Sequence, residues 1–276
     1  MPYKTLILDH EGRGGELAVL TLNRPGKRNS LSWEMMLELH SALDELEAGA
    51  ARAVILTGAG KSFCSGMDFS VLKDMAVPKA ISPNRADTGA APSAGGLEDS
   101  KRIAALFRHF YTFSKPLIGA INGHAVAGGC GIATLCDFTL AASEARFGYP
   151  EVRIGFMPAF VAIFLIRQIG EKRARDLLLT GRILEAEEAR EMGLVNEILP
   201  AERLLSRARE IAAELIALSP TSIRHTKRLL AGLFEDELDL ATARAVQASA
   251  AIRSTFDFHE GVSAFLEKCE PRWRGI

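Results

Sequence analysis

Two buried strands, each running into a glycine-rich turn, constrain what this chain can fold into. Residues 53–57 form a continuous β-prone run, and residues 117–122 form a second one. Strands that are apolar on both faces are typical of sheets covered by helices on both sides. The first run leads into the turn at 58–68, and the second leads into glycines and a predicted helix from Gly128. This repeated order of strand, glycine turn and helix predicts an α/β fold.

The remaining pattern before residue 200 fits the same class. We predict short strands at 3–8 and 16–22, a helix capped by Ser32, and a helix over about 99–113. Residues 75–97 are rich in Ala, Pro, Ser and Gly and lack periodicity, which indicates a long loop.

After residue 200 the pattern is helical throughout, at about 201–218, 221–232, 236–253 and 259–267. The chain is therefore expected to divide into an α/β core, 1–200, and a helical region, 201–276. Apolar stripes in that region, such as Leu204, Ala208, Ile211 and Leu215, predict that it mediates self-association.

Charge and composition exclude several classes of protein. The chain carries 33 basic and 34 acidic side chains among 276 residues, so we expect no nucleic-acid partner and no acidic membrane surface. The uncharged stretch 116–136 holds five glycines as well as Asn122 and His124, which argues against a membrane span. Four cysteines without a C-x-x-C pair and six scattered histidines predict no metal site and no disulfide framework. No signal peptide is recognisable, and a cytoplasmic location is expected.

Three common site motifs are absent from the sequence. Residues 58–62 resemble the end of a phosphate-binding loop, but Ile55 stands where that motif requires its first glycine. There is no G-x-G-x-x-G after a strand and no G-x-S-x-G elbow. What remains is a pair of glycine turns whose N–H groups could converge on one oxygen atom as an oxyanion hole, with an acidic residue downstream. The alternative is that these glycines only make tight turns.

Ordered motifs along almost the whole chain resemble the enoyl-CoA hydratase/isomerase (crotonase) family. They are NRP at 23–25, RNSL at 28–31, FCSGMD at 63–68, INGHA at 121–125, GGC at 128–130, FGYPE at 147–151 and EGVSAFLEK at 260–268. The resemblance implies a spiral of strand-strand-helix repeats forming two roughly perpendicular sheets. It also implies a homotrimer or a dimer of trimers, an acyl-CoA thioester substrate, and no cofactor beyond the coenzyme A of that substrate.

The resemblance also implies roles for particular residues. The backbone N–H groups of Met67 and Gly128 would stabilise the thioester enolate, and Glu151 would be the catalytic acid/base. Coenzyme A would bind along two segments, which comprise Lys27, Arg28, Ser65, Gly66, Met67, Asp68, Phe69 and Ser70, together with Gly128. Further residues expected at the pocket are His124, Gly131, Phe156 and Phe160.

One departure from the family pattern leaves the reaction open. Two-glutamate hydratases of the family carry a carboxylate where this chain has Gly131, whereas the second glutamate is kept as Glu151. We predict an enoyl-CoA hydratase that works with Glu151. The alternative is a 3-enoyl to 2-enoyl-CoA isomerase that uses the same carboxylate, followed by a hydroxyacyl-CoA lyase and by a non-catalytic acyl-CoA-binding protein.

Overall fold

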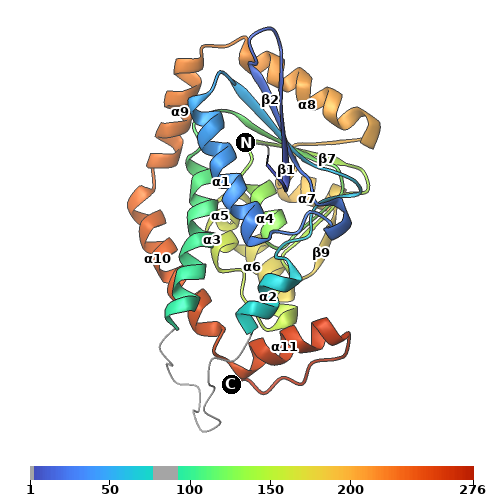
Figure 1. The fold of residues 1–276 in the computed structure, drawn as a ribbon, viewed down its shortest axis with the longest axis vertical. Helices are drawn as coiled ribbons and strands as arrows, with labels where there is room; N and C mark the ends of the chain where they lie inside the picture. Colours follow the sequence, from blue (N-terminus) through green and yellow to red (C-terminus); the bar gives the residue numbers. More distant parts are fainter. Residues whose placement is uncertain (1–2, 77–92) are drawn as a thin grey trace.

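The computed structural model describes residues 3–76 and 93–276, and two β-sheets form its centre (Figure 1). The larger sheet has the strand order β1-β2-β3-β5-β7-β10. Its strands are β1 (Leu6–Glu11), β2 (Leu17–Leu22), β3 (Ala53–Gly58), β5 (Leu117–Ile121), β7 (Phe138–Ala142) and β10 (Glu197–Leu199). Within this sheet β1 and β2 pair antiparallel, and the other neighbouring strands pair parallel. The smaller sheet has the order β4-β6-β8-β9, with β4 (Ser62–Cys64), β6 (His124–Val126), β8 (Arg146–Gly148) and β9 (Ile183–Glu185).

The larger sheet is covered by apolar side chains on both faces, as the sequence predicts. Alternate residues of one strand point to opposite sides, so Ile55 packs toward α8 (Ala201–Ile216) while Leu56 faces the main core. Leu204 and Ala208 of α8 are buried against this sheet, with Ile211 and Leu215 beside them. This stripe therefore packs within the chain and does not itself support self-association, and the assembly role of the region 201–276 stays a prediction.

The main core on the other side of the larger sheet takes buried residues from the described helices that precede β10 in the chain. They are α1 (Trp33–Ala48), α2 (Phe69–Ala76), α3 (Ala94–Thr112), α4 (Gly128–Thr134), α5 (Ala159–Ile169), α6 (Glu171–Thr180) and α7 (Ala186–Met192), with short 3-10 turns η1 (Pro25–Lys27) and η2 (Pro150–Ile154). Ser32 caps α1 by accepting the N–H of Met35, as predicted.

Helix α3 begins five residues earlier than the periodicity predicts. The side chain of Ser93 caps it by accepting the N–H of Gly96, and Gly96 packs against Ala250. A cap and a tertiary contact thus outweigh the low helix propensity of two successive glycines. The predicted loop at 75–97 lies mainly outside the described residues.

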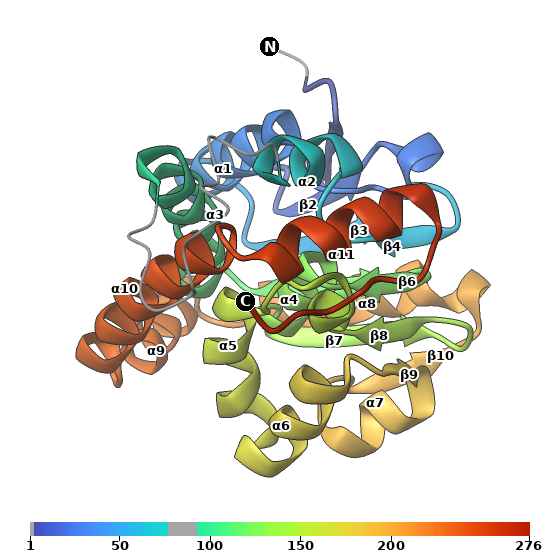
Figure 2. The same ribbon diagram turned by 90° about the horizontal axis from the view of Figure 1, so that it is seen from below.

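The predicted C-terminal helices are confirmed as α8, α9 (Pro220–Gly232), α10 (Glu235–Ile252) and α11 (Phe256–Glu267). Helix α10 packs along α3 and α5, whereas α11 turns back and lies against α2 and η2 (Figure 2). Gly155 and Gly261 allow this close approach, since a Cβ on either would overlap the backbone of the opposite segment. None of the helices in the described ranges is both long and apolar enough to span a membrane.

Candidate active site

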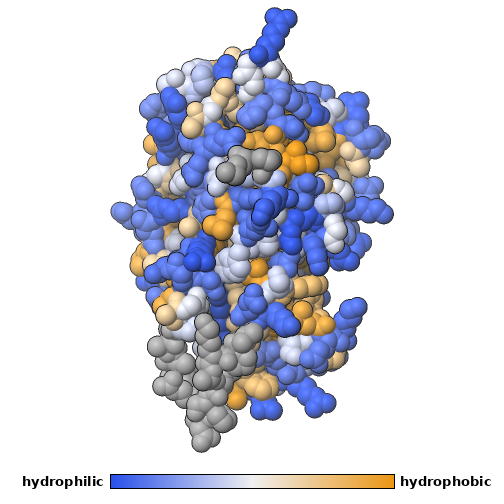
Figure 3. Space-filling view, viewed as in Figure 1, coloured by the Kyte–Doolittle hydropathy of each residue, from blue (hydrophilic) through white to orange (hydrophobic). Residues whose placement is uncertain are grey.

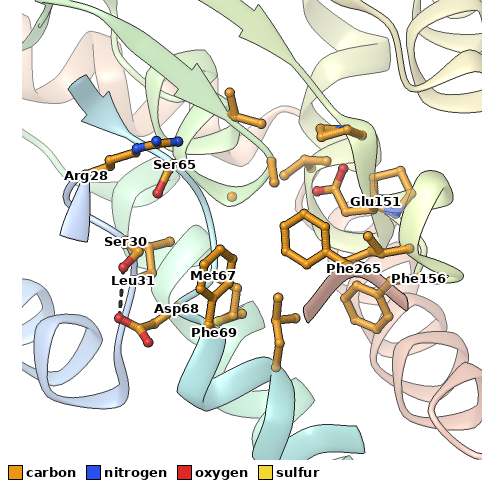
Figure 4. Close-up of a pocket in the computed structure, with 18 of the residues that line it drawn as sticks. Arg28, Ser30, Leu31, Ser65, Met67, Asp68, Phe69, Glu151, Phe156 and Phe265 are labelled. Carbon is orange, nitrogen blue, oxygen red and sulfur yellow. Dashed lines mark hydrogen bonds between the residues drawn. The ribbon is translucent and has the colours of Figure 1, made fainter. Parts of the chain in front are cut away.

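A cavity of about 1070 Å³ lies between the turn after β4, the start of α4, η2 and α11. Twelve of the residues predicted at the site line it: Lys27, Arg28, Ser65, Met67, Asp68, Phe69, Ser70, His124, Gly128, Glu151, Phe156 and Phe160. Met67 and Asp68 lie on one side of this pocket, and Glu151 and Phe156 lie on the other (Figure 4). The predicted residues Gly66 and Gly131 lie outside the lining, and each has a different role in the packing.

Glu151 is a buried carboxyl group at the edge of the pocket. It lies in the first turn of η2, which Pro150 begins and Gly155 ends in a left-handed conformation. Only 9% of the residue is exposed, and its Oε2 atom has no hydrogen-bond partner in the described part of the chain. Burial raises the pKa of Glu151 to about 7, although a hydrogen bond with its own backbone lowers it in part. Near neutral pH both protonation states are thus populated, which suits a group that takes up and returns a proton.

The two glycine turns meet directly, and their glycines are what permits it. Gly66 has φ +84°, and a Cβ there would lie 2.8 Å from the Cβ of Ala127 and 3.6 Å from the amide nitrogen of Gly128. A Cβ on Gly129 would overlap the carbonyl oxygen of Cys64. The turns after β4 and β6 are thereby brought to one place, and Gly66 acts through this contact.

Both predicted oxyanion donors remain available at this contact. Gly128 is the first residue of α4, where N–H groups have no acceptor within the helix. On the other turn, Leu31 donates to the carbonyl of Gly66 at 2.8 Å, and Asp68 donates to the carbonyl of Leu31 at 3.0 Å. These bonds fix the backbone on either side of Met67, whose own N–H donates to no carbonyl among the described residues.

Gly131 is enclosed by apolar side chains. It is buried in α4, and a Cβ at this position would overlap Cγ1 of Val161 and lie 2.5 Å from Cε1 of Phe107. Both of these side chains line the pocket, and Phe107 stacks on Phe160 with ring centroids 6.5 Å apart. The expectation that Gly131 itself borders the pocket is wrong, because Phe107 and Val161 stand in front of it. Apolar side chains thus enclose the position at which the family resemblance implies a first glutamate.

Basic side chains border the pocket on several elements. Lys27 is the last residue of η1 and Arg28 follows it, and Arg28 and Asn29 adopt left-handed conformations with φ of 51° and 54°. Arg153 of η2 and Lys268 after α11 add two further positive charges. Such a cluster suits the phosphates of coenzyme A.

The C-terminal helix contributes lining residues that the sequence did not identify. Phe265, Leu266 and Lys268 border the pocket, and Phe265 meets Phe69 of α2 edge to face with centroids 5.3 Å apart. An apolar residue on a helix signals burial, but it does not reveal whether the neighbour is core or cavity. The one sequence feature that could have indicated a ligand site here is Lys268, a basic residue directly after this helix.

In the described ranges, no group of three or more His, Cys, Asp or Glu side chains is placed to hold a metal ion. His124 is exposed and borders the pocket from β6. Among the titratable side chains that line the cavity, Glu151 is therefore the one best suited to transfer a proton.

Comparison with known proteins identifies the family. The model for "Enoyl-CoA hydratase/isomerase" matches residues 12–275. The chain belongs to this family. It is 45% identical to the Thermus thermophilus protein named "Putative enoyl-CoA hydratase", over 94% of this chain and 98% of the relative. It is 35% identical to the short-chain-enoyl-CoA hydratase of Clostridium acetobutylicum, over 97% of each chain.

Solved structures confirm the fold that the sequence predicts. The enoyl-CoA hydratase/isomerase of Xanthobacter autotrophicus Py2 superposes with a TM-score of 0.83 at 28% identity, covering 96% of this chain and 94% of that one. The α/β crotonase fold, with its two sheets and C-terminal helices, is thus established for this chain.

Proposed function

We propose that this chain is an enoyl-CoA hydratase, which adds water to the double bond of a 2-enoyl-CoA. The observation that carries the proposal is a buried carboxyl group, Glu151, with a free oxygen and a pKa of about 7, in one pocket with two available amide donors. The short-chain-enoyl-CoA hydratase of Clostridium and the Thermus protein, both similar over nearly their full length, support the same reaction.

The proposed mechanism uses one carboxylate for both proton transfers. Ionised Glu151 takes a proton from water as the water oxygen bonds to C3 of the enoyl group. Electrons move onto the thioester oxygen, where the N–H groups of Met67 and Gly128 stabilise the enolate. The enolate then collapses as Glu151 returns its proton to C2, so water is added and the enzyme is restored. Each amide donor is typically worth about 3–4 kcal/mol in such a site.

A specific observation favours isomerisation as a second candidate. Phe107 and Val161 enclose Gly131 and line the same pocket as Glu151, so apolar side chains stand where the resemblance would place a second carboxylate. Moving a proton between two carbons of one acyl chain needs a single carboxylate and no bound water. In that reaction Glu151 removes a proton from C2 of a 3-enoyl-CoA and delivers it to C4.

One experiment separates these reactions. The protein is incubated with 2-enoyl-CoA and 3-enoyl-CoA substrates of several lengths, and the products are followed by mass and by ultraviolet absorbance. A gain of one water from 2-enoyl-CoA supports hydration, whereas unchanged mass with a shifted double bond supports isomerisation. The absence of both reactions, with acyl-CoA still bound, would contradict the enzymatic proposal.

We further propose that the chain assembles as a homotrimer or a dimer of trimers. Exposed apolar side chains gather on α9 and α10 and between them: Leu229, Leu230, Leu233, Phe234 and Leu240 are each about half exposed or more. On the face seen in Figure 3, apolar residues form patches within a mostly hydrophilic surface. Light scattering tests the proposal, and a stable active monomer at micromolar concentration would overturn it.

A further inference from the structure

We infer that Arg24 strengthens the oxyanion hole from outside the pocket, by polarising the Met67 amide through two peptide units connected in series. The inference rests on the proposed function, because it concerns the donor that would receive the enolate oxygen. Arg24 does not line the pocket, so it is a positioning residue and not a catalytic one.

The first link joins the guanidinium to the peptide between Ser30 and Leu31. Nη1 of Arg24 donates to the carbonyl oxygen of Ser30 at 2.6 Å. The N–H of the same peptide, which belongs to Leu31, donates to the carbonyl oxygen of Gly66 at 2.8 Å. In a planar trans peptide the C=O and N–H point in opposite directions. A cation at the Ser30 carbonyl oxygen therefore polarises this peptide and makes the Leu31 N–H a stronger donor.

The second link is the peptide between Gly66 and Met67. Its carbonyl accepts the bond from Leu31, so its N–H points away from that segment and is left for the thioester oxygen. Hydrogen bonds in such chains polarise one another, each strengthening the next by a modest fraction. A positive charge at the start makes the Met67 N–H a stronger donor at the end.

Asp68 holds the cation at the start of this chain. Its Oδ2 atom accepts from Nη1 of Arg24 at 2.8 Å and from the Ser30 hydroxyl at 2.8 Å. Its Oδ1 atom accepts from the backbone N–H of Ser70 at 2.9 Å and from the Ser70 hydroxyl at 2.8 Å. Figure 4 shows the bond between Ser30 and Asp68 beside Met67. The Asp68 side chain is 9% exposed and that of Arg24 is 21% exposed, so solvent screens the pair only weakly.

The turn that carries Ser30 is itself fixed before substrate arrives. The side chain of Asn29 accepts from the N–H of Arg24 at 2.8 Å and donates to the carbonyls of Ala59 and Ser62 at 2.9 and 2.7 Å. The 24–31 turn is thereby tied to both ends of the turn between β3 and β4. Donors that are held in place in advance cost no reorganisation when charge develops.

The test uses Arg24→Gln and Arg24→Lys, with Arg209→Gln as the matched control. Arg209 pairs with Glu11 on the surface and lies outside the pocket lining. Butyryl-CoA, labelled with ¹³C at the thioester carbonyl, is bound to each variant, and its carbonyl stretch is read by infrared difference spectroscopy. kcat and KM for a 2-enoyl-CoA are measured in parallel, and thermal melting checks folding.

We expect the carbonyl stretch of bound butyryl-CoA to move to lower frequency in the wild type and in Arg209→Gln. In Arg24→Gln part of that displacement should be lost and kcat should fall roughly 10-fold, with KM changed less than about threefold. This loss is smaller than the 10²–10³-fold cost of removing an oxyanion donor outright. For Arg24→Lys, the carbonyl frequency and kcat should both lie between those of the wild type and of Arg24→Gln, because one ammonium group replaces the planar guanidinium group.

Separate results would overturn the inference and the proposed function. A folded Arg24→Gln protein with the carbonyl frequency and kcat of the wild type would overturn the role of Arg24. Should the glutamine variant not fold, the neutral Arg24→Met, which keeps much of the side-chain length, takes its place, and wild-type frequency and kcat in that folded variant would overturn the role of Arg24 equally. A wild-type protein that leaves the butyryl-CoA carbonyl unshifted would instead contradict the oxyanion hole of the proposed function.

Discussion

The two sides of the pocket treat a carboxyl group in opposite ways. On one side, the Asp68 carboxylate accepts four hydrogen bonds and pairs with Arg24. Burial alone would raise its pKa, but the bonds from Ser70, Arg24 and Ser30 outweigh that and hold the pKa well below its ordinary value. On the other side, Glu151 is buried with one oxygen unpartnered, and its pKa rises to about 7.

The difference distinguishes a carboxylate that stabilises the fold, Asp68, from a carboxyl group that can transfer protons, Glu151. A fully satisfied carboxylate stays ionised and fixes the backbone around it. A carboxyl group buried without partners destabilises the fold when ionised, yet it exchanges protons near neutral pH. Sites commonly combine both kinds of environment, and the tests below separate the two sides, starting with the largest expected effect.

Glu151→Gln should lower kcat by about 10²–10⁴-fold, the usual contribution of a general acid/base. The amide keeps the shape of the side chain, so acyl-CoA binding should persist. Steady-state kinetics and a binding titration with butyryl-CoA check the two statements. Retention of more than half the activity would remove Glu151 from the mechanism.

Gly128→Pro should lower kcat by about 10²–10³-fold, because proline removes the N–H that would receive the enolate oxygen. Gly128→Ala keeps the donor and serves as the control, although its Cβ would lie 3.2 Å from Leu31. Circular dichroism distinguishes a lost donor from a lost fold. An active and folded proline variant would show that this amide is not a donor in the reaction.

The pH dependence of stability should differ in sign between the two sides. Glu151 binds its proton more tightly folded than unfolded, so it contributes stability at low pH that is lost as pH rises from about 4.5 to about 7. That loss is on the order of 3 kcal/mol. Asp68 binds its proton more weakly when folded, so its contribution is present above its ordinary pKa and disappears in acid.

Two neutral variants measure this difference by thermal melting across pH. Glu151→Gln should be more stable than the wild type at pH 8, with the gain vanishing near pH 5. Asp68→Asn should be less stable at pH 8, since it leaves Arg24 partly buried without its anion. A stability profile with the same sign for both variants would contradict the comparison.

Most of the candidate site could be found from the sequence, whereas much of its surroundings could not. The segments carrying Met67, Gly128 and Glu151 have local signatures, because glycine turns and the start of a helix are short-range features. The link from Arg24 to the Ser30 carbonyl depends on backbone direction after two left-handed residues, which no residue pattern specifies. Amphipathic spacing likewise did not say that α8 covers the sheet and α11 the pocket, because periodicity identifies a buried face but not its partner.

Gly131→Glu tests the apolar surroundings of Gly131, where Phe107 and Val161 leave no room for a side chain. We expect destabilisation of about 1–3 kcal/mol from overpacking, and no gain in water addition. Gly232→Ala is the control, since a Cβ there meets nothing within 4 Å. Adding Val161→Ala makes space, and increased hydration only in the double variant would show that packing excludes the second carboxylate. A stable single variant with faster hydration would contradict this account.

Ala127→Gly should have the smallest effect on activity. It tests the contact between the two glycine turns. Ala127 has φ 51° and ψ −127°, a conformation that residues with a Cβ rarely adopt, and it typically costs about 1–3 kcal/mol. Glycine relieves that strain but gives the unfolded chain more freedom, which offsets about 0.5–1 kcal/mol. The net expectation is a stabilisation of about 1 kcal/mol, read by denaturant unfolding.

Activity of Ala127→Gly should stay within about twofold of the wild type. The Ala127 N–H donates to the Gly148 carbonyl and thereby aims the following Gly128 amide, and this bond does not involve the side chain. A destabilised glycine variant would show that the Ala127 methyl group, close to Gly66, holds the two turns together by packing.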